Sequence, residues 1–295
     1  MSRDRKREVV RKVNQSTNYP IAPLCCLLGL PRSSYYYQPP EADESALRAA
    51  VEAVAGRFPT YGSRRVTEQL QRPPHALSVN RKHIQRLMRE MGLQRPVKRR
   101  TYRTTDSRHG FPRYPNRVAG LDITHPDQVW VSDITYIRLA SEFVFLAVIM
   151  DVFTRSIRGW QLSRSLDQFL TLTALQRALA SHTPTIHHSD QGVQYAATAY
   201  VDLLKHHQVQ ISMAAQGAPE ENPFAERLMR TIKEEEVDLS DYRNFDDALA
   251  QIGHFIEAVY QHKRIHSALD YLTPAEFERA YWMTQGEQMS SLNFP

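Results

Sequence analysis

The sequence predicts a mixed α/β domain in the later part of the chain, preceded by an all-α domain. Three consecutive runs rich in β-branched and aromatic residues begin near residue 127, which is typical of neighbouring β-strands. Alternating helical and strand patterns follow them, whereas residues 44–94 show helical periodicity alone. Three strands followed by alternating helices and strands describe one sheet with helices on both faces.

The composition is that of an ordinary globular protein. The chain has 295 residues, which is enough for two compact domains, and 42% of them are apolar. No run of about 18 uncharged apolar residues occurs, so we expect no membrane span. The first ten residues are too charged for a signal peptide. Cys25 and Cys26 are neighbours that cannot form a disulfide framework or a four-ligand zinc site, which predicts a cytoplasmic protein.

The net charge of +5 hides a marked asymmetry between the two parts of the chain. Residues 1–119 hold 24 Lys and Arg against 9 Asp and Glu, whereas residues 120–295 hold 13 against 23. A basic half suits a polyanion such as nucleic acid, although charged surfaces also serve solubility alone. An acidic half that approaches the same polyanion needs cations to do so.

The basic half contains a helix-turn-helix pattern. Residues 1–40 predict short helices and turns that end at Pro39 and Pro40. Three helical segments follow at 44–58, 62–71 and 80–92, the last with Asn80 as N-cap and Gly92 just beyond its end. A short helix, a turn and a basic helix are typical of a DNA-binding module, although a small bundle with a solvated basic face remains the alternative. The candidate DNA-binding residues here are Arg64, Arg65, Arg81, Lys82 and Arg86.

A basic tract connects the two parts of the chain. Residues 95–113 hold seven arginines or lysines and show almost no apolar period, which predicts an exposed linker. Such a linker can lie along phosphates with an affinity that is independent of sequence and sensitive to salt. Its candidate contacts include Lys98, Arg99 and Arg100.

The α/β part predicts five strands and several helices. The runs "QVWVSDITYIRL", "EFVFLAVIMDV" and "RSIRGWQLS" are separated by short gaps and predict an antiparallel meander. A helix at 167–181, the strand "TIHH", a helix near 196–207 and the strand "VQISM" complete a mixed sheet. Two long helices follow, at about 223–237 and 245–262.

Two aspartates occupy notable positions in the predicted sheet, one within a strand and one just after a strand. Asp133 is in the middle of an apolar strand, where an isolated carboxylate would lose several kcal/mol of hydration. Asp190 follows the strand "TIHH", and side chains at the strand ends of an α/β sheet gather at one rim. Hydrogen bonds to backbone amides or a bound metal ion could compensate either charge. Asp190 could also be a solvated turn residue.

A third acidic residue lies on a predicted helix. Glu226 shares one helical stripe with Arg230 and Lys233, separate from the apolar stripe of Ala225, Leu228, Met229 and Ile232. By itself this glutamate suggests only a surface ion pair with Arg230. Together with Asp133 and Asp190, however, it gives a set of oxygen ligands suited to Mg²⁺ or Mn²⁺. Two such ions can activate a hydroxyl and stabilise the leaving oxygen of a phosphodiester.

These residues also carry a resemblance to a known family. "VWVSDITYI", "HHSDQGVQY" and "ENPFAERLMRTIKEE", with 35 residues between Asp190 and Glu226, resemble the signature blocks of DDE transposases and retroviral integrases. More narrowly, the chain resembles the OrfB protein of the IS-three family of bacterial insertion sequences. "FPTYGSRRVTEQL" and "VNRKHIQRLMREMGL" are similar to the HTH-like domain of that family, and "YQHKRIHSALDYLTPAEF" is similar to its C-terminal block.

The resemblance implies an RNase H-like integrase core with a mixed five-stranded sheet, preceded by an all-α HTH-like domain. It implies that Asp133, Asp190 and Glu226 are the catalytic, Mg²⁺-binding triad and that Lys233 lies near the DNA end. The family commonly has Asp-Asn where this chain has Glu221-Asn222, which puts the local turn in question. Asp151 fits a hairpin turn better than a ligand role, and His187 and His188 are either packed, exposed or in contact with the metal ligands.

The resemblance also implies partners. The DNA would be the terminal inverted repeats of the element and its target, bound by a homo-oligomer close to the nucleoid, without a membrane. In this family an upstream OrfA segment is usually fused to OrfB by frameshifting, and no heptad run of that kind is visible here. The expected division is a helical segment at 1–40, the HTH-like domain at 41–95, a basic linker at 96–122, the catalytic core at 123–238 and a helical extension at 239–295.

The leading hypothesis is a Mg²⁺-dependent DNA transposase that uses water and then a 3′-hydroxyl as nucleophiles. One alternative is a catalytically silent DNA-binding regulator of transposition. The other is an RNase H-type nuclease that acts on RNA–DNA hybrids.

Overall fold

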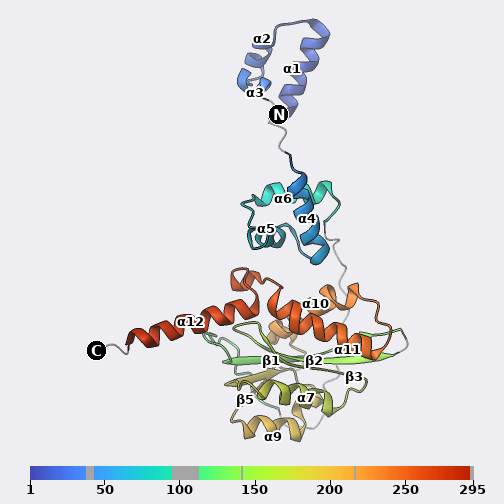
Figure 1. Cartoon of the computed structure of the whole chain (residues 1–295), viewed down its shortest axis with the longest axis vertical. Helices are drawn as coiled ribbons and strands as arrows, with labels where there is room; N and C mark the ends of the chain where they lie inside the picture. Colours follow the sequence, from blue (N-terminus) through green and yellow to red (C-terminus); the bar gives the residue numbers. More distant parts are fainter. Residues whose placement is uncertain (38–42, 95–112, 141, 216, 293–295) are drawn as a thin grey trace. The chain divides into compact units, whose positions relative to one another are not determined.

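The computed structural model of the chain describes residues 1–37, 43–94, 113–140, 142–215 and 217–292 (Figure 1). It divides into two compact units, Met1–Arg48 and Ala49–Pro295. No helix in these ranges is both long enough and apolar enough to cross a lipid bilayer. Lys98, Arg99 and Arg100 lie outside the described residues.

The first unit consists of short helices joined by turns, as predicted for residues 1–40. Ser2 caps its first helix, because the serine hydroxyl accepts a hydrogen bond from the Arg5 amide. Val10, Cys25 and Leu30 are buried together and form a small core between the helices. The helices are α1 (Arg3–Thr17), α2 (Ile21–Leu27) and α3 (Arg32–Tyr36).

A second helical segment precedes the sheet and has the predicted helix-turn-helix order. It consists of α4 (Ser45–Arg57), α5 (Ser63–Gln71) and α6 (Arg81–Glu90). The Asn80 side chain accepts a hydrogen bond from the Lys82 amide, and Gly92 has a φ of 69°, which confirms both predicted ends of the last helix. Val66 and Leu70 of α5 are buried, as are Ile84, Leu87 and Met88 of α6, so the two helices pack through their apolar stripes.

The rest of the chain is built on one mixed sheet of five strands in the order β3-β2-β1-β4-β5. Strands β1, β2 and β3 form the predicted antiparallel meander, whereas β4 pairs parallel to β1 and β5 parallel to β4. The fold class predicted from the sequence is therefore confirmed. The strands are β1 (Val129–Arg138), β2 (Phe143–Asp151), β3 (Ile157–Ser163), β4 (Ile186–Ser189) and β5 (Gln210–Met213).

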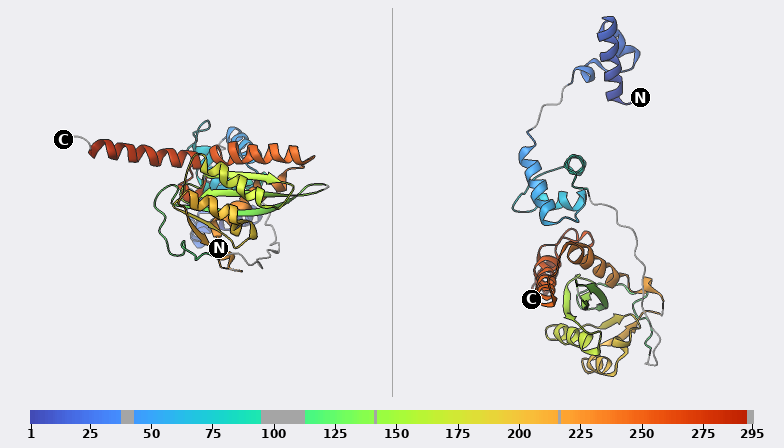
Figure 2. Two further views of the ribbon diagram at one scale, coloured as in Figure 1. Left: turned by 90° about the horizontal axis from the view of Figure 1, so that it is seen from below. Right: turned by 90° about the vertical axis from the view of Figure 1, so that its right-hand side faces the viewer.

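Helices cover both faces of the sheet (Figures 1 and 2). One face carries α7 (Gln168–Leu179) and α9 (Thr198–His206), and the other carries α10 (Pro223–Glu235) and α11 (Phe245–His254). This arrangement explains why the central strands are apolar on both sides. The remaining elements are α8 (Val193–Ala196), α12 (Pro274–Leu292) and the 3₁₀ turns η1 (Pro219–Glu221), η2 (Val237–Leu239) and η4 (Ser267–Leu269).

The helix predicted over 245–262 differs in one respect from the expectation. It is α-helical as far as His254 and continues as a π-helix, η3 (Phe255–Tyr260). Phe255, Ile256 and Tyr260 are all buried in this wider segment, in the same core cluster as the strand residues beneath them. Apolar periodicity alone does not distinguish the two helix types, because both bury one stripe of residues.

The contact between β3 and α7 depends on a glycine. A Cβ atom on Gly159 would lie 2.2 Å from the Ala174 carbonyl oxygen and 2.9 Å from the Ala178 Cβ. The backbone of the strand therefore approaches the helix more closely than any other residue would allow.

We predict that Gly159→Ala destabilises the protein by about 1–3 kcal/mol, because the added methyl group must push α7 away from the sheet. Urea unfolding followed by circular dichroism measures this change. Gly56→Ala is the matched control, since nothing lies within 4 Å of a Cβ at that helical position. Equal unfolding midpoints for the two variants would contradict the close approach.

Candidate active site

The pairing of β1 with β4 brings the segments that carry two predicted ligands next to each other. Val131 and His188 form the last pair of this parallel ladder, and Asp133 on β1 and Asp190 just after β4 each follow that pair by two residues. Neighbouring strands lie roughly 4.8 Å apart. Burial raises the pKa of the Tyr195 hydroxyl well above its usual value, and the charges of Tyr200, Asp133 and Asp190 add to this effect. Both aspartates therefore act on the pKa of the same buried tyrosine.

Backbone amides orient both carboxylates. Asp133 Oδ1 accepts a hydrogen bond of 2.8 Å from the Ile134 amide, and Asp190 Oδ1 accepts one of 3.0 Å from the Gly192 amide. A Cβ on Gly192 would lie 2.9 Å from that same Asp190 oxygen. The loop after β4 thus needs a glycine at this position so that the carboxylate can keep its orientation.

Glu226 lies in the first turn of α10, which packs on the face of β1 that carries Asp133. Side chains alternate along a strand, so Asp133 is on the same face as Val131, which shares a core cluster with Ala225 and Leu228 of α10. The Asn222 amide group donates a hydrogen bond of 3.1 Å to the carbonyl oxygen of Ser132, the residue before Asp133. The start of the glutamate-bearing helix is thereby attached directly beside the first aspartate. Asn222 was not singled out as a functional residue from the sequence.

The segment before α10 is fixed by Glu221, where the chain departs from the family pattern. Its Oε2 accepts hydrogen bonds from the Ala215 amide at 2.8 Å and from the Asn116 side chain at 2.9 Å. The hydrogen bond from Ala215 is the main cause that lowers the pKa of this carboxyl, and the bond from Asn116 adds to it. The glutamate therefore closes the loop that leads into the helix.

His187 and His188 are packed, neutral side chains. His187 is buried against the Tyr200 hydroxyl at 2.9 Å, and burial lowers its pKa to about 3. His188 contacts the Ser212 hydroxyl at 2.8 Å and the Glu221 carbonyl oxygen at 3.1 Å, and burial lowers its pKa as well. They hold β4, β5 and the loop before α10 together.

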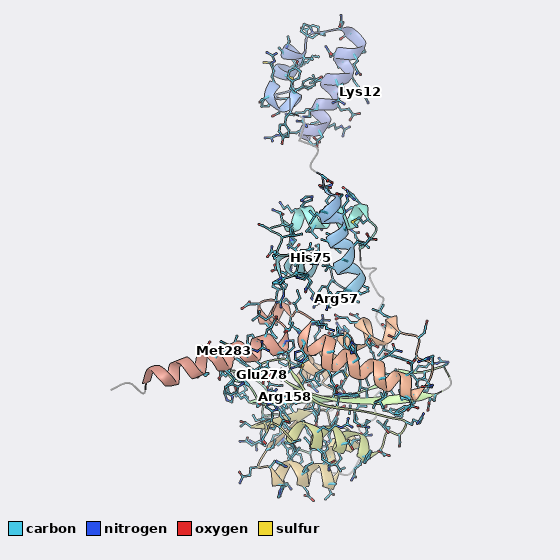
Figure 3. All side chains as sticks on the ribbon, in the orientation of Figure 1. Lys12, Arg57, His75, Arg158, Glu278 and Met283 are labelled. Carbon is cyan, nitrogen blue, oxygen red and sulfur yellow. The ribbon has the colours of Figure 1, made fainter. Side chains whose placement is uncertain are left out.

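A different acidic group forms elsewhere in the described part of the chain. Ligand atoms of Asp127, His182 and Glu278 all lie within 4.8 Å of one another. Arg158, whose side chain is only 5% exposed, already pairs with Asp127 at 2.8 Å and with Glu278 at 2.7 Å. Figure 3 labels Arg158 and Glu278 of this group. An arginine therefore supplies the positive charge here, and the group does not indicate a metal site.

Asp151 acts as a turn residue, as its sequence context suggested. It is fully buried, and its Oδ2 accepts hydrogen bonds from the Thr154 amide at 2.8 Å and the Thr154 hydroxyl at 2.6 Å. Its other oxygen accepts a bond of 3.0 Å from the Asp127 amide. These bonds close the connection between β2 and β3.

The described candidates for DNA binding differ in their solvent exposure and in whether they form ion pairs within the protein. Arg86 pairs with Glu90 at 2.9 Å, and Arg65 pairs with Glu235 at 3.4 Å. Lys233 is half-buried. Besides Arg86, the exposed candidates are Arg64, Arg81, Lys82 and Arg230.

A buried ionic network at the far end of α10 escaped the sequence analysis. Arg264, which is 2% exposed, holds Glu235 through two bonds of 2.6 Å and 2.7 Å. Next to it, the Tyr61 hydroxyl accepts a hydrogen bond of 3.0 Å from the Ile265 amide. Since Glu235 also meets Arg65, the network connects the turn and helix at 61–71 to the helix that carries Glu226. Neither Arg264 nor Glu235 has a sequence signal beyond its charge.

Comparisons with known proteins agree with this architecture. Models described as integrase core domain match residues 123–219 and 207–274, and a model described as HTH-like domain matches residues 41–101. The insertion element IS600 31 kDa protein of Shigella sonnei is 33% identical over 269 residues, which cover 88% of this chain and 98% of that protein. Transposase InsF for IS3A of Escherichia coli K12 is 30% identical and covers 74% and 76%. The chain belongs to the IS-three (IS3) family of transposases.

Another transposase matches most of this chain. The IS629 transposase of Shigella sonnei is 31% identical over 91% of this chain and 94% of its own length. Among solved structures, the HTLV-2 integrase catalytic core in complex with magnesium has a TM-score of 0.44 and 16% identity, over 52% of this chain and 97% of that one. An IS-three transposase is a polynucleotidyl transferase, so the enzyme class predicted from the sequence is confirmed.

We predict that His266 makes stability depend on pH. Burial is the main cause that lowers its pKa, together with Arg264 and other arginines, to about 2, against 6.5 for an unperturbed histidine. The unfolded chain therefore binds a proton that the folded chain does not, and stability is lost as the pH falls below 6.5. Between pH 7.5 and pH 5.5 this histidine should account for about 1.4 kcal/mol of that loss.

Urea unfolding of wild type and His266→Gln at the two pH values measures this contribution. The amide oxygen of glutamine can still accept the hydrogen bond that Arg264 Nη1 makes to His266 Nε2 at 3.1 Å. The pH-dependent loss should be about 1.4 kcal/mol smaller in the variant. An identical loss in both proteins would show that His266 is not the titrating group.

Proposed function

We propose that this transposase cleaves and joins DNA strands by divalent-metal-dependent phosphodiester transfer, with Asp133, Asp190 and Glu226 as its catalytic residues. One observation supports the proposal: both aspartates follow the last β1–β4 pair, Val131 with His188, by two residues, and Asn222 attaches the start of the glutamate-bearing helix to Ser132. Water and then a 3′-hydroxyl are the proposed nucleophiles. The activity of the chain thus depends on three carboxylates held at one rim of the sheet.

The donor set fits Mg²⁺ or Mn²⁺, because all three side chains offer hard oxygen atoms. Bound there, two ions would lower the pKa of the attacking hydroxyl and stabilise charge on the leaving oxygen. The protein's own contribution is orientation: amides of Ile134 and Gly192 aim the two aspartates, and α10 presents Glu226. Little else is required of the protein, since phosphoryl transfer relies on positioning and charge neutralisation.

DNA contacts in this proposal come from two parts of the chain. The exposed arginines and lysine of α5 and α6 suit phosphates of the element's terminal repeats, as does the basic linker before the sheet. Arg230 and Lys233 follow Glu226 by four and seven residues, so they continue its stripe of α10 towards the DNA end. Arg65 would have to exchange its bond to Glu235 for a phosphate.

Partners follow from the same proposal. The chain would act as the OrfB part of a system in which an OrfA segment, or an OrfAB fusion, assists recognition of the ends. Two ends and one target suit a homo-oligomer assembled on DNA. We propose the five-part division at 1–40, 41–95, 96–122, 123–238 and 239–295 for designing truncations, and a nucleoid-associated location in the cytoplasm.

The test uses the DNA that flanks the reading frame, where inverted repeats would mark the element ends. Wild-type protein is incubated with labelled end duplex and Mg²⁺, beside Asp190→Asn and Glu226→Gln. We predict strand cleavage or joining by wild type and a loss of about a thousandfold or more in either variant, because each removes several kcal/mol of transition-state stabilisation. Glu220→Gln, an exposed carboxylate near the start of the same helix, should retain activity.

Other outcomes separate the alternatives. Full activity in Asp190→Asn would remove this residue from the mechanism. DNA binding by wild type without cleavage in Mg²⁺ or Mn²⁺ would favour a silent regulator, and cleavage confined to the RNA strand of a hybrid would favour an RNase H-type nuclease. Chelation of divalent ions should abolish cleavage but leave DNA binding.

We further predict that Gly192→Ala lowers strand transfer while the protein stays folded. The new methyl group would lie 2.9 Å from Asp190 Oδ1, so the carboxylate must rotate. A rate about tenfold to a hundredfold lower is expected, as for other groups that orient metal ligands. Gly62→Ala, whose Cβ meets nothing within 4 Å, is the control, and equal rates in the two variants would contradict this role of Gly192.

A further inference from the structure

The turn between β2 and β3 holds an arginine in an unusual backbone conformation. Arg155 has a φ of 62°, in the left-handed region that glycine tolerates and other residues rarely adopt. The turn is closed around it by a hydrogen bond of 3.0 Å from the Arg155 amide to the Asp151 carbonyl oxygen. Strained residues held by a well-bonded turn are frequent at functional sites, so this arginine is a candidate for one.

The side chain of Arg155 is also unusual, because its charge has no ion-pair partner among the described residues, although Tyr260 and Asp151 act on it electrostatically. The guanidinium carbon lies 4.3 Å from the centre of the Phe224 ring, and Nη1 is buried without a hydrogen-bond partner among the described residues. No carboxylate within the described ranges forms an ion pair with it. Burial lowers the pKa of this group, although arginine remains charged at neutral pH. A half-buried charge of this kind is costly unless an anion completes it.

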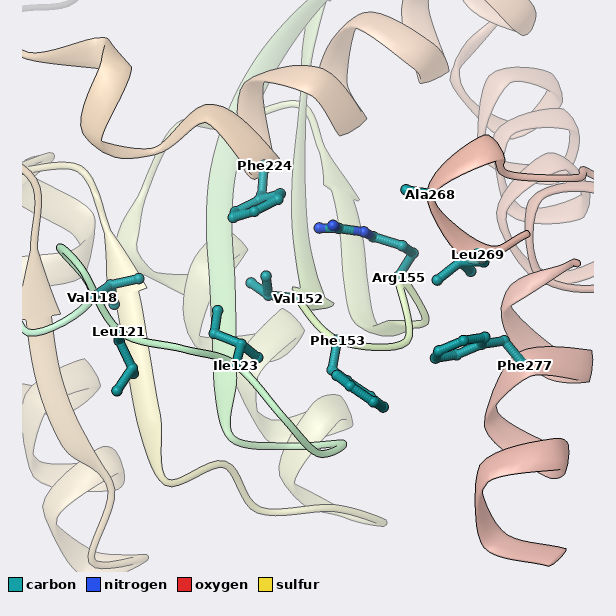
Figure 4. Close-up of a pocket in the computed structure, with 10 residues that line it drawn as sticks. All are labelled: Val118, Leu121, Ile123, Val152, Phe153, Arg155, Phe224, Ala268, Leu269 and Phe277. Carbon is teal, nitrogen blue, oxygen red and sulfur yellow. The ribbon is translucent and has the colours of Figure 1, made fainter. Parts of the chain in front are cut away.

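Among the described residues that line an otherwise apolar cavity of about 370 Å³, Arg155 is the one charged side chain. Figure 4 shows its guanidinium pointing across the cavity towards Phe224, with Phe153 and Phe277 on the walls. Val152 and Leu269 add aliphatic surface. The volume lies in the range of about 300–1,000 Å³ that is common for small-molecule sites, and it is large enough for a planar ring system.

The cavity lies beside the first turn of α10, the helix that carries Glu226. Phe224 and Glu226 are two residues apart on α10, so their side chains leave the helix on opposite flanks. With its side chains a helix is about 10 Å wide, which corresponds to roughly three nucleotides at about 3.4 Å of rise each. A DNA strand whose scissile phosphate lies at Glu226 can therefore reach the cavity within a few nucleotides.

We infer that this cavity binds one nucleotide of the DNA end, with the base against the aromatic walls and the phosphate on Arg155. The inference rests on the proposed strand-transfer function and adds to it a specific contact. A nucleotide has both groups that suit this lining, a flat aromatic base for the phenylalanine rings and a phosphate for the arginine. Bases also stack on aromatic side chains in single-stranded sites without regard to sequence.

The test measures binding of a pre-cleaved end duplex by fluorescence anisotropy, with chelator present and Asp190→Asn as the background so that no cleavage occurs. Arg155→Gly removes the charge while glycine suits the positive φ, so the variant should fold. We expect its affinity to fall about tenfold and the slope of log K against log[salt] to decrease by about 0.9, because one phosphate contact is lost. The affinity of Arg155→Lys should lie between that of the parent protein and that of Arg155→Gly. Arg279→Ala, which removes an exposed arginine elsewhere, should change neither the affinity nor the salt slope.

A phosphate scan then locates the contact. Replacing phosphates one at a time by neutral methylphosphonates should identify a single position, about three nucleotides from the cleavage point, at which wild type and Arg155→Gly bind equally well. Unchanged affinity and salt slope in Arg155→Gly would overturn the inference. A lowered melting temperature with unchanged binding would also overturn it, because Arg155 would then serve only to hold Phe224.

Failure of the inference is distinguishable from failure of the proposed function. Strand transfer is not measured in the binding assay, so a protein without catalytic activity can still show a DNA contact that depends on Arg155. An active transposase whose DNA binding ignores Arg155 would leave the catalytic proposal intact.

Discussion

The parallel pairing of β1 with β4 is the constraint on which the proposed site depends. It joins residues more than fifty positions apart in the sequence and fixes them in register, and Asp133 and Asp190 each follow the last of these pairs by two residues. Strand β1 can carry this carboxylate because Asp133 is only half-buried and its Oδ1 accepts a hydrogen bond from the Ile134 amide. Shifting the register by one residue would move one aspartate to the opposite face.

Helix α10 complements this pairing because it is attached at both ends. At its start, Asn222 bonds to β1, while His188 and Glu221 fix the preceding loop to β4 and β5. Near its end, Glu235 is held by Arg264, a side chain almost completely removed from water. Breaking such a buried pair would leave one charge uncompensated, so the attachment is strong even if the pair adds little net stability.

Much of this arrangement could be predicted from the sequence, and the missing parts have a common cause. Strand runs, capping residues such as Asn80 and the three acidic candidates are local signals, and they predicted the five-stranded sheet and the helix-turn-helix order correctly. Partners of buried charges are not local. Arg65 has the composition of a DNA contact, yet it meets Glu235, 170 residues away. The position of the Arg155 guanidinium over the Phe224 ring is equally invisible to periodicity, because it joins residues far apart in the sequence.

The double attachment of α10 limits how this segment can change in evolution. Eight residues lie between Glu226 and Glu235, and each of these two glutamates must meet its surroundings at a fixed angle around the helix. One inserted or deleted residue would rotate the two ends against each other by about 100° and shift them by about 1.5 Å. Substitutions between them can be absorbed by repacking, whereas a change of length cannot, so the spacing should be more strictly maintained among relatives than the identity of the residues within it.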